Sequence, residues 1–465
     1  MKDRFLFLSR YVHFLKQSHV VACYHSLRMI PVYVSDDFLL IIKKFTNGNS
    51  LQNVLDSIDF DRQEDFLSTV KALEFAKILI NSVADDENAL GYYLGLLGKP
   101  YPHLAYFILT ERCNFRCKYC FIKNQESSDY DSENMSLEIA LKGLDFFCLL
   151  IAEDPKQFEL EKTIVFYGGE PLLNWCVLRI LLTKIEEYIQ NGKLPKRTIL
   201  NMVTNGSLIT NEIAEVLKNS NVQVSISIDG DSFATNSSRA YADGRPVYQD
   251  IKRGFLVCKE AGMNIGASCT LSEASISDFD TTIEVLLDEC QITNLGFNLM
   301  ITGEDKLNDG YNERAAKFII NAFKIFRERG VYEDRIMRKV TSFVESKVWL
   351  FDCGATGGNQ IVIAPNGDVG VCHGFLAKRK YFPINVFDND FNIHDDSDYK
   401  EWSMRSPINM PECQECFALG ICGGGCPFQS EIEKGSIWAL DDRFCIHAKM
   451  TLEWLIWDLF NKMKK

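Results

Sequence analysis

The stretch that decides both fold and chemistry is L-T-E-R-C-N-F-R-C-K-Y-C, residues 109–120. It places Cys113, Cys117 and Cys120 directly after an apolar, strand-like run at residues 103–110. Three thiolates on one loop can hold iron or zinc, and three ligands leave one metal position open for chemistry. The alternatives are a zinc site completed from elsewhere, or ordinary buried cysteines. The end of a barrel strand, where such enzymes keep their active sites, disfavours both alternatives.

Downstream of this loop, strand-like and helix-like segments alternate six times. This alternation predicts right-handed β/α units and a parallel sheet. The strands read as apolar on both faces, as expected where helices cover the outside and another layer fills the inside. We therefore predict an α/β fold whose residues 101–335 form a partial (β/α)6 TIM-type barrel. The expected strands lie at residues 103–110, 163–169, 197–206, 221–230, 263–271 and 294–301.

The spacing Cys-x3-Cys-x2-Cys, with an aromatic residue before the last cysteine, resembles the loop of the radical S-adenosylmethionine (SAM) superfamily. The resemblance implies that Cys113, Cys117 and Cys120 are the catalytic cysteines and hold a [4Fe-4S] cluster. The unique iron of that cluster would chelate the methionine part of SAM. Reductive cleavage of SAM would give a 5'-deoxyadenosyl radical that abstracts a hydrogen atom from the substrate, while the protein positions the reactants and excludes water.

The second expected strand ends in F-Y-G-G-E-P, residues 166–171. Two glycines let the backbone approach a ligand closely, and a carboxylate can offset a cation. By the same resemblance, Gly168, Gly169, Glu170 and Pro171 contact the methionine ammonium of SAM. The alternative is a glycine turn that ends the strand, with a solvated Glu170.

Polar residues end the third and fourth expected strands and suit a ribose and an α-carboxylate. The resemblance implies that Ser227 binds the ribose, with Asn205 and Asp229 as further candidates nearby. It also places Arg239 on the carboxylate of SAM, although a solvated loop arginine is the alternative. The remaining candidates for contact with the adenine are Tyr119, which could equally be a core aromatic, and residues 265–267, which could equally belong to a close-packed core strand.

Seven further cysteines follow one another in an ordered pattern between residues 345 and 465. This pattern resembles the SPASM domain, which holds auxiliary clusters in radical enzymes that mature peptides and proteins. The resemblance implies a first auxiliary [4Fe-4S] cluster on Cys353, Cys372 and Cys426, and a second on Cys413, Cys416, Cys422 and Cys445. The first cluster is then one ligand short: its open iron could bind a substrate thiolate, or His373 could close it. A pair of zinc sites is the alternative.

Composition limits the remaining possibilities. The chain has 465 residues, 16 cysteines and a formal net charge of -13. We expect a cytoplasmic protein with reduced thiols, because the N-terminal residues show no cleavage site and no apolar run is long enough to span a membrane. The negative charge supports neither nucleic acid nor an anionic membrane as a partner. The cysteines outside the two patterns are expected to be buried small hydrophobes: Cys23, Cys148, Cys176, Cys258, Cys269 and Cys290.

Residues 1–100 read as a separate domain, joined to the barrel by the linker G-K-P-Y-P at residues 98–102. Two β-like runs at residues 20–34 precede amphipathic helical patterns at residues 38–45, 51–58 and 65–81. This winged-helix-like order resembles the leader-recognition domain of maturases that act on ribosomally made peptides, in which a leader strand adds to a sheet edge. A structural cap or a dimerisation domain is the alternative.

Together, these resemblances imply a radical SAM peptide maturase with three [4Fe-4S] clusters. Its expected partners are a precursor peptide with a leader sequence and an electron donor such as flavodoxin or ferredoxin. The expected product is a thioether crosslink of the sactipeptide or ranthipeptide type. The alternatives are carbon-carbon cyclisation of a peptide, anaerobic sulfatase maturation by formylglycine formation, whose enzymes usually have an aspartate where this chain has His373, and a non-catalytic iron-sulfur scaffold.

Overall fold

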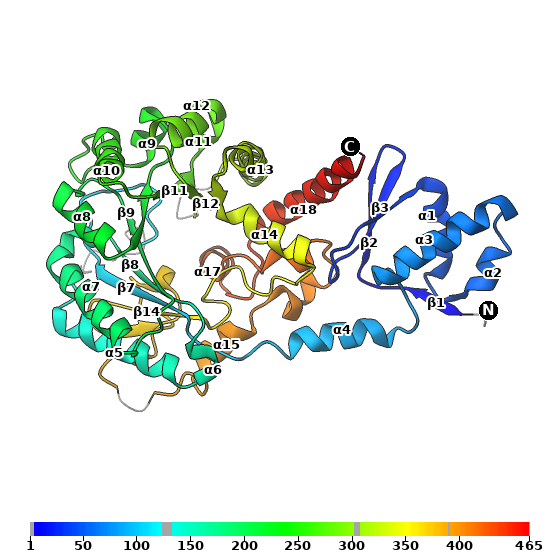
Figure 1. The fold of residues 1–465 in the computed structure, drawn as a ribbon, viewed down its shortest axis with the longest axis horizontal. Helices are drawn as coiled ribbons and strands as arrows, with labels where there is room; N and C mark the ends of the chain where they lie inside the picture. Colours follow the sequence, from blue (N-terminus) through cyan, green and yellow to red (C-terminus); the bar gives the residue numbers. More distant parts are fainter. Residues whose placement is uncertain (1–3, 123–132, 302–306, 389–390, 465) are drawn as a thin grey trace.

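The computed structural model describes residues 4–122, 133–301, 307–388 and 391–464. The chain forms an N-terminal part, an open barrel and a C-terminal part that lies between the two (Figure 1). No helix in these described ranges is both long and apolar enough to cross a membrane.

The N-terminal part contains two small antiparallel sheets and three helices. One sheet has the order β2-β3-β4 and the other β5-β1-β6. A core of its own, which includes Val21, Phe45 and Phe66, joins them. The elements are β1 (Phe5–Leu8), β2 (Val12–Gln17), β3 (Val20–His25), β4 (Val32–Ser35), α1 (Asp36–Ile42), β5 (Asn49–Ser50), α2 (Leu51–Leu55), α3 (Gln63–Phe75) and β6 (Leu79–Ile80).

Three features of this part differ from the expectation. Strands β1 and β2 did not stand out in the sequence, because β1 is only four residues long and β2 is half-buried without clear alternation. Helix α3 ends at Phe75 instead of continuing to residue 81, since Lys77 adopts a left-handed φ of 58° and β6 follows. Helix α4 (Ala84–Leu94) was also not predicted from the sequence, because it has no apolar stripe and its buried residue is Asp86.

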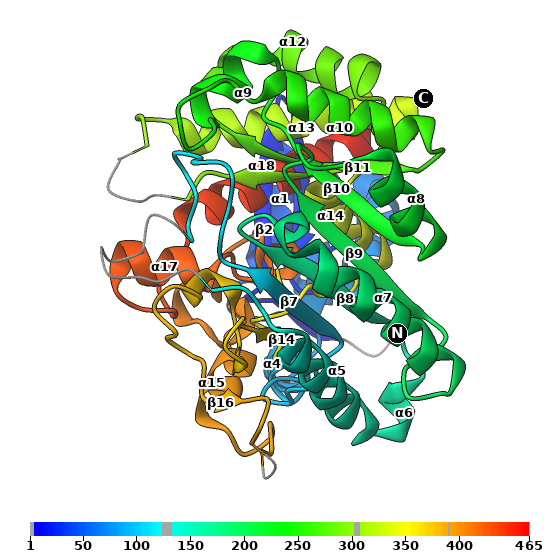
Figure 2. The ribbon, with the colours of Figure 1, turned by 90° about the vertical axis from the view of Figure 1, so that its left-hand side faces the viewer.

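The barrel has the six expected parallel strands, in the order in which they follow one another in the chain. This confirms the predicted α/β fold. Helices α5 (Leu137–Ala152), α7 (Trp175–Gln190), α8 (Asn211–Asn219), α10 (Tyr248–Glu260) and α13 (Tyr311–Arg329) belong to this part, and Figure 2 shows α7 and α8 along the outside of the strands. The strands are β7 (Leu104–Thr110), β8 (Lys162–Gly168), β9 (Thr198–Thr204), β10 (Val222–Ser227), β11 (Ile265–Leu271) and β12 (Asn294–Leu299).

The two faces of this sheet differ in character. Side chains such as Phe107, Phe166 and Phe297 belong to the main apolar core. The opposite face of β10 to β12 carries small and polar residues: the registers place Ser227 beside Ser268, whose hydroxyl accepts a bond of 2.9 Å from Asn298. The expectation of two apolar faces was therefore wrong for these strands. A closed barrel fills its inside with branched apolar residues, whereas this open one has a polar interior.

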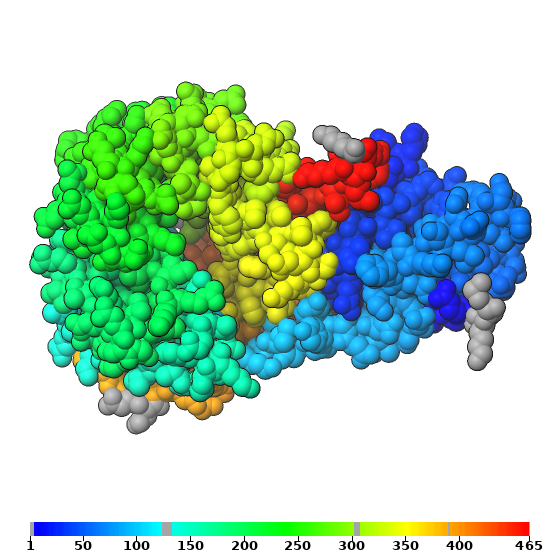
Figure 3. All heavy atoms as spheres, in the orientation of Figure 1, coloured from blue at the N-terminus to red at the C-terminus, as the bar shows by residue number. Residues whose placement is uncertain are grey.

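The C-terminal part extends the barrel sheet and then becomes helical. Strand β14 (Gln360–Ile363) pairs in parallel with β7, and β15 (Asp368–Gly370) turns back on it after a turn at residues 364–367. Helix α18 (Asp442–Met463) then spans 22 residues. Its apolar face packs with residues of the N-terminal part, and the red end of the chain rests on the blue part in Figure 3.

Candidate active site

The loop with the first three cysteines is fixed by backbone bonds to a segment that follows β10. The amide of Arg116 donates to the Ala240 carbonyl at 2.8 Å, and that of Lys118 donates to the Ser238 carbonyl at 2.9 Å. Helix α9 (Ser232–Ser238) ends where this segment begins. The loop is therefore held against the carboxyl ends of the barrel strands, where the sequence placed it.

The three sulfurs of this loop lie within electrostatic reach of one another. Burial raises the pKa of Cys113 to about 12, and Glu170, Cys117 and Cys120 add to this effect. Burial also raises the pKa of Cys117 to about 11, although Arg239 opposes it. Thiols in such surroundings are protonated near neutral pH unless a metal binds them and displaces the protons. Their number, burial and proximity fit an iron-sulfur cluster.

The glycines of residues 168–169 allow the backbone to approach this same loop. A Cβ atom on Gly168, whose φ is 143°, would lie 2.2 Å from the Thr110 oxygen, and one on Gly169 would lie 2.2 Å from the Arg112 oxygen. The Gly169 amide donates to the Thr110 carbonyl at 2.8 Å. The two glycines therefore allow close packing against the chain's own backbone, in addition to the close approach of a ligand that the sequence predicts.

Glu170 ties the second strand end to the third. It is fully buried and accepts bonds from the Thr204 hydroxyl at 2.7 Å and from the Asn205 amide at 2.8 Å. Burial raises the pKa of its carboxyl group to about 7. The solvated Glu170 considered above is therefore wrong. Pro171, which starts a short 3₁₀ turn, is buried beside it.

Asn205 connects this strand end to the cysteine loop. Its Nδ2 donates to Asn114 Oδ1 at 2.8 Å, and its Oδ1 accepts from the Ser207 hydroxyl at 2.7 Å. Asn114 directly follows Cys113. Neither Thr204 nor Asn114 stood out in the sequence, because single polar residues at strand ends are common.

Asp229 and Arg239 form a buried pair beside the cysteines. Arg239 is 6% exposed, so the alternative of a solvated loop arginine is wrong. Its Nε and Nη2 donate to the two Asp229 oxygens at 2.9 and 3.0 Å, and its Nη1 lies 4.0 Å from the Cys117 sulfur. The Tyr119 hydroxyl donates to Asp229 at 2.5 Å. The structure thus brings four of the predicted site residues into one network, in which Nη1 faces the sulfur.

Residues on β10 and β11 divide between the interior and the core. Ser227 is half-buried on the interior face. Ile265 and Ala267 belong to the apolar core, which supports the core-strand alternative for both. Gly266 lies between them on the other face, where a Cβ atom would meet Ser225 and Asn294.

The C-terminal thiols influence one another electrostatically in two groups. Burial raises the pKa of Cys372 well above its usual value, and the thiols of Cys426 and Cys353 add to this. Burial raises the pKa of Cys413 to about 12, with further contributions from Cys422, Cys445 and Cys416. In the described residues, no group of three or more His, Cys, Asp and Glu side chains is placed to hold a single metal ion. The fit of each set to a larger cluster rests on donor type and number, since only Cys372 and Cys422 of the seven thiols are buried.

His373 packs in a box of aromatic rings. Its ring lies 4.7 Å from that of Tyr106, 5.3 Å from that of Tyr167 and 5.6 Å from that of Phe121. Burial lowers its pKa to about 4, and its Nδ1 has no hydrogen-bond partner among the described residues. The thiols that influence Cys372 electrostatically are those of Cys426 and Cys353.

One contact that the sequence could not indicate joins the cysteine loop to the C-terminal part. Glu111 is fully buried and accepts a bond of 2.7 Å from Arg379 Nη2 and one of 3.1 Å from the Glu133 amide. Glu111 and Arg379 lie far apart in the chain, so no local pattern connects them.

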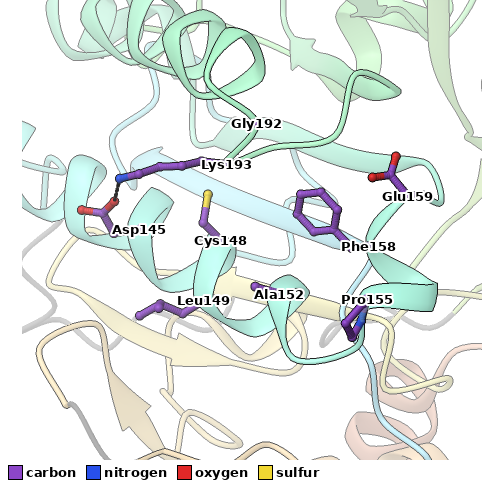
Figure 4. Close-up of a pocket in the computed structure, with 9 residues that line it drawn as sticks. All are labelled: Asp145, Cys148, Leu149, Ala152, Pro155, Phe158, Glu159, Gly192 and Lys193. Atoms are coloured by element: carbon purple, nitrogen blue, oxygen red, sulfur yellow. Dashed lines mark ion pairs between the residues drawn. The ribbon is translucent and has the colours of Figure 1, made fainter.

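The remaining cysteines follow the expectation with one exception. Cys23, Cys148, Cys258, Cys269 and Cys290 are buried, whereas Cys176 is exposed on the second residue of α7. Cys148 lines a pocket of 620 Å³ outside the barrel, between α5 and the loop after α7 (Figure 4). Lys193 and Asp145 form an ion pair of 3.8 Å there. None of the predicted site residues lines this pocket.

Comparison with known proteins agrees with this geometry. Residues 107–286 match the family model of the radical SAM superfamily. A radical SAM cyclopropyl synthase, TigE, from Paramaledivibacter caminithermalis is 27% identical over 75% of this chain and 73% of its own length. Serine-type and cysteine-type anaerobic sulfatase-maturating enzymes also match, at 21% identity. Residues 107–286 thus form a radical SAM domain, and a radical SAM enzyme is among the proteins to which the chain is similar.

Solved structures support the fold. The enzyme anSMEcpe with bound AdoMet has a TM-score of 0.64 and 20% identity, covering 78% of this chain and all of its own. Streptococcus suis SuiB bound to SAM has a TM-score of 0.53 and 16% identity, covering 94% of this chain and 99% of its own. The match to the superfamily model confirms the first resemblance. Proteins of this superfamily bind SAM and a [4Fe-4S] cluster.

Proposed function

We propose that this protein is a peptide maturase that joins a cysteine of a ribosomally made precursor peptide to a carbon atom of the same peptide, forming a thioether. The observation that carries this proposal is the first auxiliary set, Cys353, Cys372 and Cys426, which has three thiols where the second set has four. An iron with an open position suits a thiolate of the substrate, which is a soft ligand.

The chain's own residues would bind and orient the reactants. Cys113, Cys117 and Cys120 would hold the cluster, which when bound would supply the electron for the reductive cleavage of SAM. Glu170 and Asn205 fix the strand ends around the cysteine loop, and Arg239 orients one free donor toward Cys117. The methionine contacts of Gly168, Gly169 and Pro171, the ribose contacts of Ser227 and Asp229, and the adenine contact of Tyr119 remain part of this proposal.

The proposed crosslink balances as an oxidation by two electrons. The radical removes one hydrogen atom from a substrate carbon, and the substrate thiol loses a proton as its sulfur bonds to that carbon. One electron is left for an acceptor, a role that we assign to the auxiliary clusters held by the two C-terminal sets. A small electron carrier such as flavodoxin or ferredoxin supplies the electron for the first cleavage.

A groove on the N-terminal part supports a peptide as the substrate. It is a pocket of 490 Å³ formed by residues 30–33 around the edge strand β4, by Ala72 and Phe75 of α3, and by the end of α18. Among the described strands, β4 pairs with β3 alone, so its outer edge is available to an added strand. Phe75 is 78% exposed, and such an apolar side chain beside a free edge suits the side chains of a bound leader.

The proposal is tested with anaerobically reconstituted enzyme, SAM, a reductant and a precursor peptide encoded next to its gene. The expected product has lost two hydrogens, no longer reacts with iodoacetamide at the linked cysteine, and fragments on both sides of the link in mass spectrometry. A peptide whose cysteines are replaced by alanine serves as the control. An unmodified cysteine-containing peptide, in the presence of 5'-deoxyadenosine formation, contradicts the proposal.

The leader groove leads to a separate prediction. We expect Phe75→Asp to weaken leader binding by roughly tenfold to a hundredfold, because an exposed apolar contact is lost to a charge. Fluorescence anisotropy with a labelled leader peptide measures the change. Phe60→Asp is the matched control, since Phe60 is 89% exposed in the same domain and does not line the groove. Equal effects of the two substitutions place the leader elsewhere.

A second candidate function is carbon-carbon cyclisation within the peptide. The relative named as a cyclopropyl synthase favours it. This reaction needs no substrate cysteine, so the alanine-substituted peptide separates the two: loss of two hydrogens from that peptide indicates a carbon-carbon bond. Sulfatase maturation is supported by the names of more distant relatives, and a sulfatase peptide in the same assay tests it.

A further inference from the structure

Helix α14 (Asp334–Glu345) brings three cations to the region between the barrel and the C-terminal thiols. Lys339 is the most deeply buried of them, with 1% of its side chain exposed. A buried lysine is costly unless a negative group compensates its charge. The positive charge of Lys339 therefore requires a negative group nearby.

The carboxylates near α14 do not fully neutralise its three cations, Arg335, Arg338 and Lys339. Arg338 pairs with Asp334, one turn earlier on the helix. Asp352 is shared: its Oδ2 lies 3.4 Å from Arg335 Nη1, and its Oδ1 lies 3.9 Å from Lys339 Nζ. A third carboxylate, that of the buried Glu333, accepts from the backbone amides of Arg335 and Ile336 instead of from a cationic side chain. The three cationic side chains thus pair with two carboxylates, and Lys339 has the longest of these contacts.

Another buried group next to Lys339 does not supply the missing charge. His447 of α18 is buried, and neither of its ring nitrogens has a hydrogen-bond partner among the described residues. Burial lowers its pKa well below the usual value, and Lys339, Arg335 and Arg338 lower it further. This histidine is therefore neutral at physiological pH.

The second auxiliary set lies next to this excess of positive charge. The Ser342 hydroxyl, one turn after Lys339, donates to the Gly420 carbonyl of α16 (Leu419–Cys422) at 3.0 Å. The Asp352 amide donates to the carbonyl of Gly423, the residue after Cys422, at 2.8 Å. These two bonds place α14 and its partner Asp352 directly against the segment that carries Cys422.

We propose that Lys339 is a positioning residue for charge, and that it raises the reduction potential of the cluster held by Cys413, Cys416, Cys422 and Cys445. Four thiolates give such a cluster a net negative charge, and reduction adds another. A fixed cation within a buried site lowers the energy of the more negative state more than that of the less negative one. The inference rests on the proposed function only in assuming that this set holds a cluster.

The test is a potentiometric titration of the reconstituted full-length chain, followed by electron paramagnetic resonance without any peptide. The signal lost in Cys422→Ala identifies the cluster to be followed. We expect Lys339→Met to shift its midpoint to a more negative potential, Lys339→Arg to leave it nearly unchanged, and Asp352→Asn to shift it to a more positive potential. Because Asp352→Asn acts in the opposite direction, the test does not depend on the folding of Lys339→Met.

Two outcomes overturn the inference. One is a midpoint that moves equally in Lys339→Met and Lys339→Arg, or that Asp352→Asn does not raise. The other is a Cys422→Ala chain that retains all of its iron and every signal, which removes the cluster itself. A failure to crosslink peptide leaves these titrations unaffected, so it is distinguishable from a failure of this inference.

Discussion

Substitution of Cys117 by alanine abolishes the formation of 5'-deoxyadenosine, measured by chromatography after anaerobic incubation with SAM and dithionite. The reason is geometric: two thiols, Cys113 and Cys120, cannot retain a cluster that leaves one iron free for SAM. We also expect the iron content to fall from about twelve to about eight atoms per chain, since one of three [4Fe-4S] clusters is lost.

The matched control for this substitution is Cys176→Ala. Cys176 is exposed on α7 and outside all three sets of thiols, so its removal leaves both iron content and SAM cleavage intact. A Cys117→Ala protein that still forms 5'-deoxyadenosine contradicts the active-site assignment. A wild-type protein that binds iron but never cleaves SAM favours the non-catalytic scaffold over every enzymatic function.

The barrel could be predicted from the sequence because its determinants are local. Each strand is a short apolar run followed by a helical pattern, and such alternation has one common structural solution. The polar interior was harder to foresee. Ser225 and Ser227 sit between apolar residues on β10, and only the pairing with β11 shows that they share one face with Ser268.

The N-terminal part was predicted less completely, for a physical reason. Its strands are short and its sheets are stabilised by contacts from distant elements: Tyr24 packs in one core with Leu452 and Leu455 of α18. A short strand whose partner surface comes from the other end of the chain has little signal of its own. The same dependence makes the end of α18 a wall of the leader groove.

The candidate site was predictable in its residues but not in their connections. The spacing of cysteines predicted three sets of thiols, and within each set the thiols lie close enough to influence one another electrostatically. The pair of Asp229 and Arg239 and the bond between Glu111 and Arg379 required coordinates. Each pair contains a fully buried carboxylate, Asp229 or Glu111, and removal of its cationic partner leaves that buried charge uncompensated, which is strongly destabilising. The cysteine loop is therefore held in place by groups that bind no metal.

The backbone contact at Gly169 leads to the second large effect. We expect Gly169→Ala to reduce SAM cleavage by about a hundredfold, because the new Cβ atom, 2.2 Å from the Arg112 oxygen, must push the cysteine loop away. Overpacking of this kind also lowers the free energy of unfolding by about 1–3 kcal/mol. Chromatography of 5'-deoxyadenosine and urea denaturation measure the two effects.

Gly91→Ala is the control that separates this contact from a general intolerance of the chain to the exchange of glycine for alanine. Gly91 lies within α4, and a Cβ atom there meets nothing within 4 Å. Alanine at this helical position raises the free energy of unfolding by about 0.5–1 kcal/mol and leaves SAM cleavage unchanged. Full activity of Gly169→Ala shows that the loop tolerates displacement, in which case the glycines serve the approach of SAM rather than that of the loop.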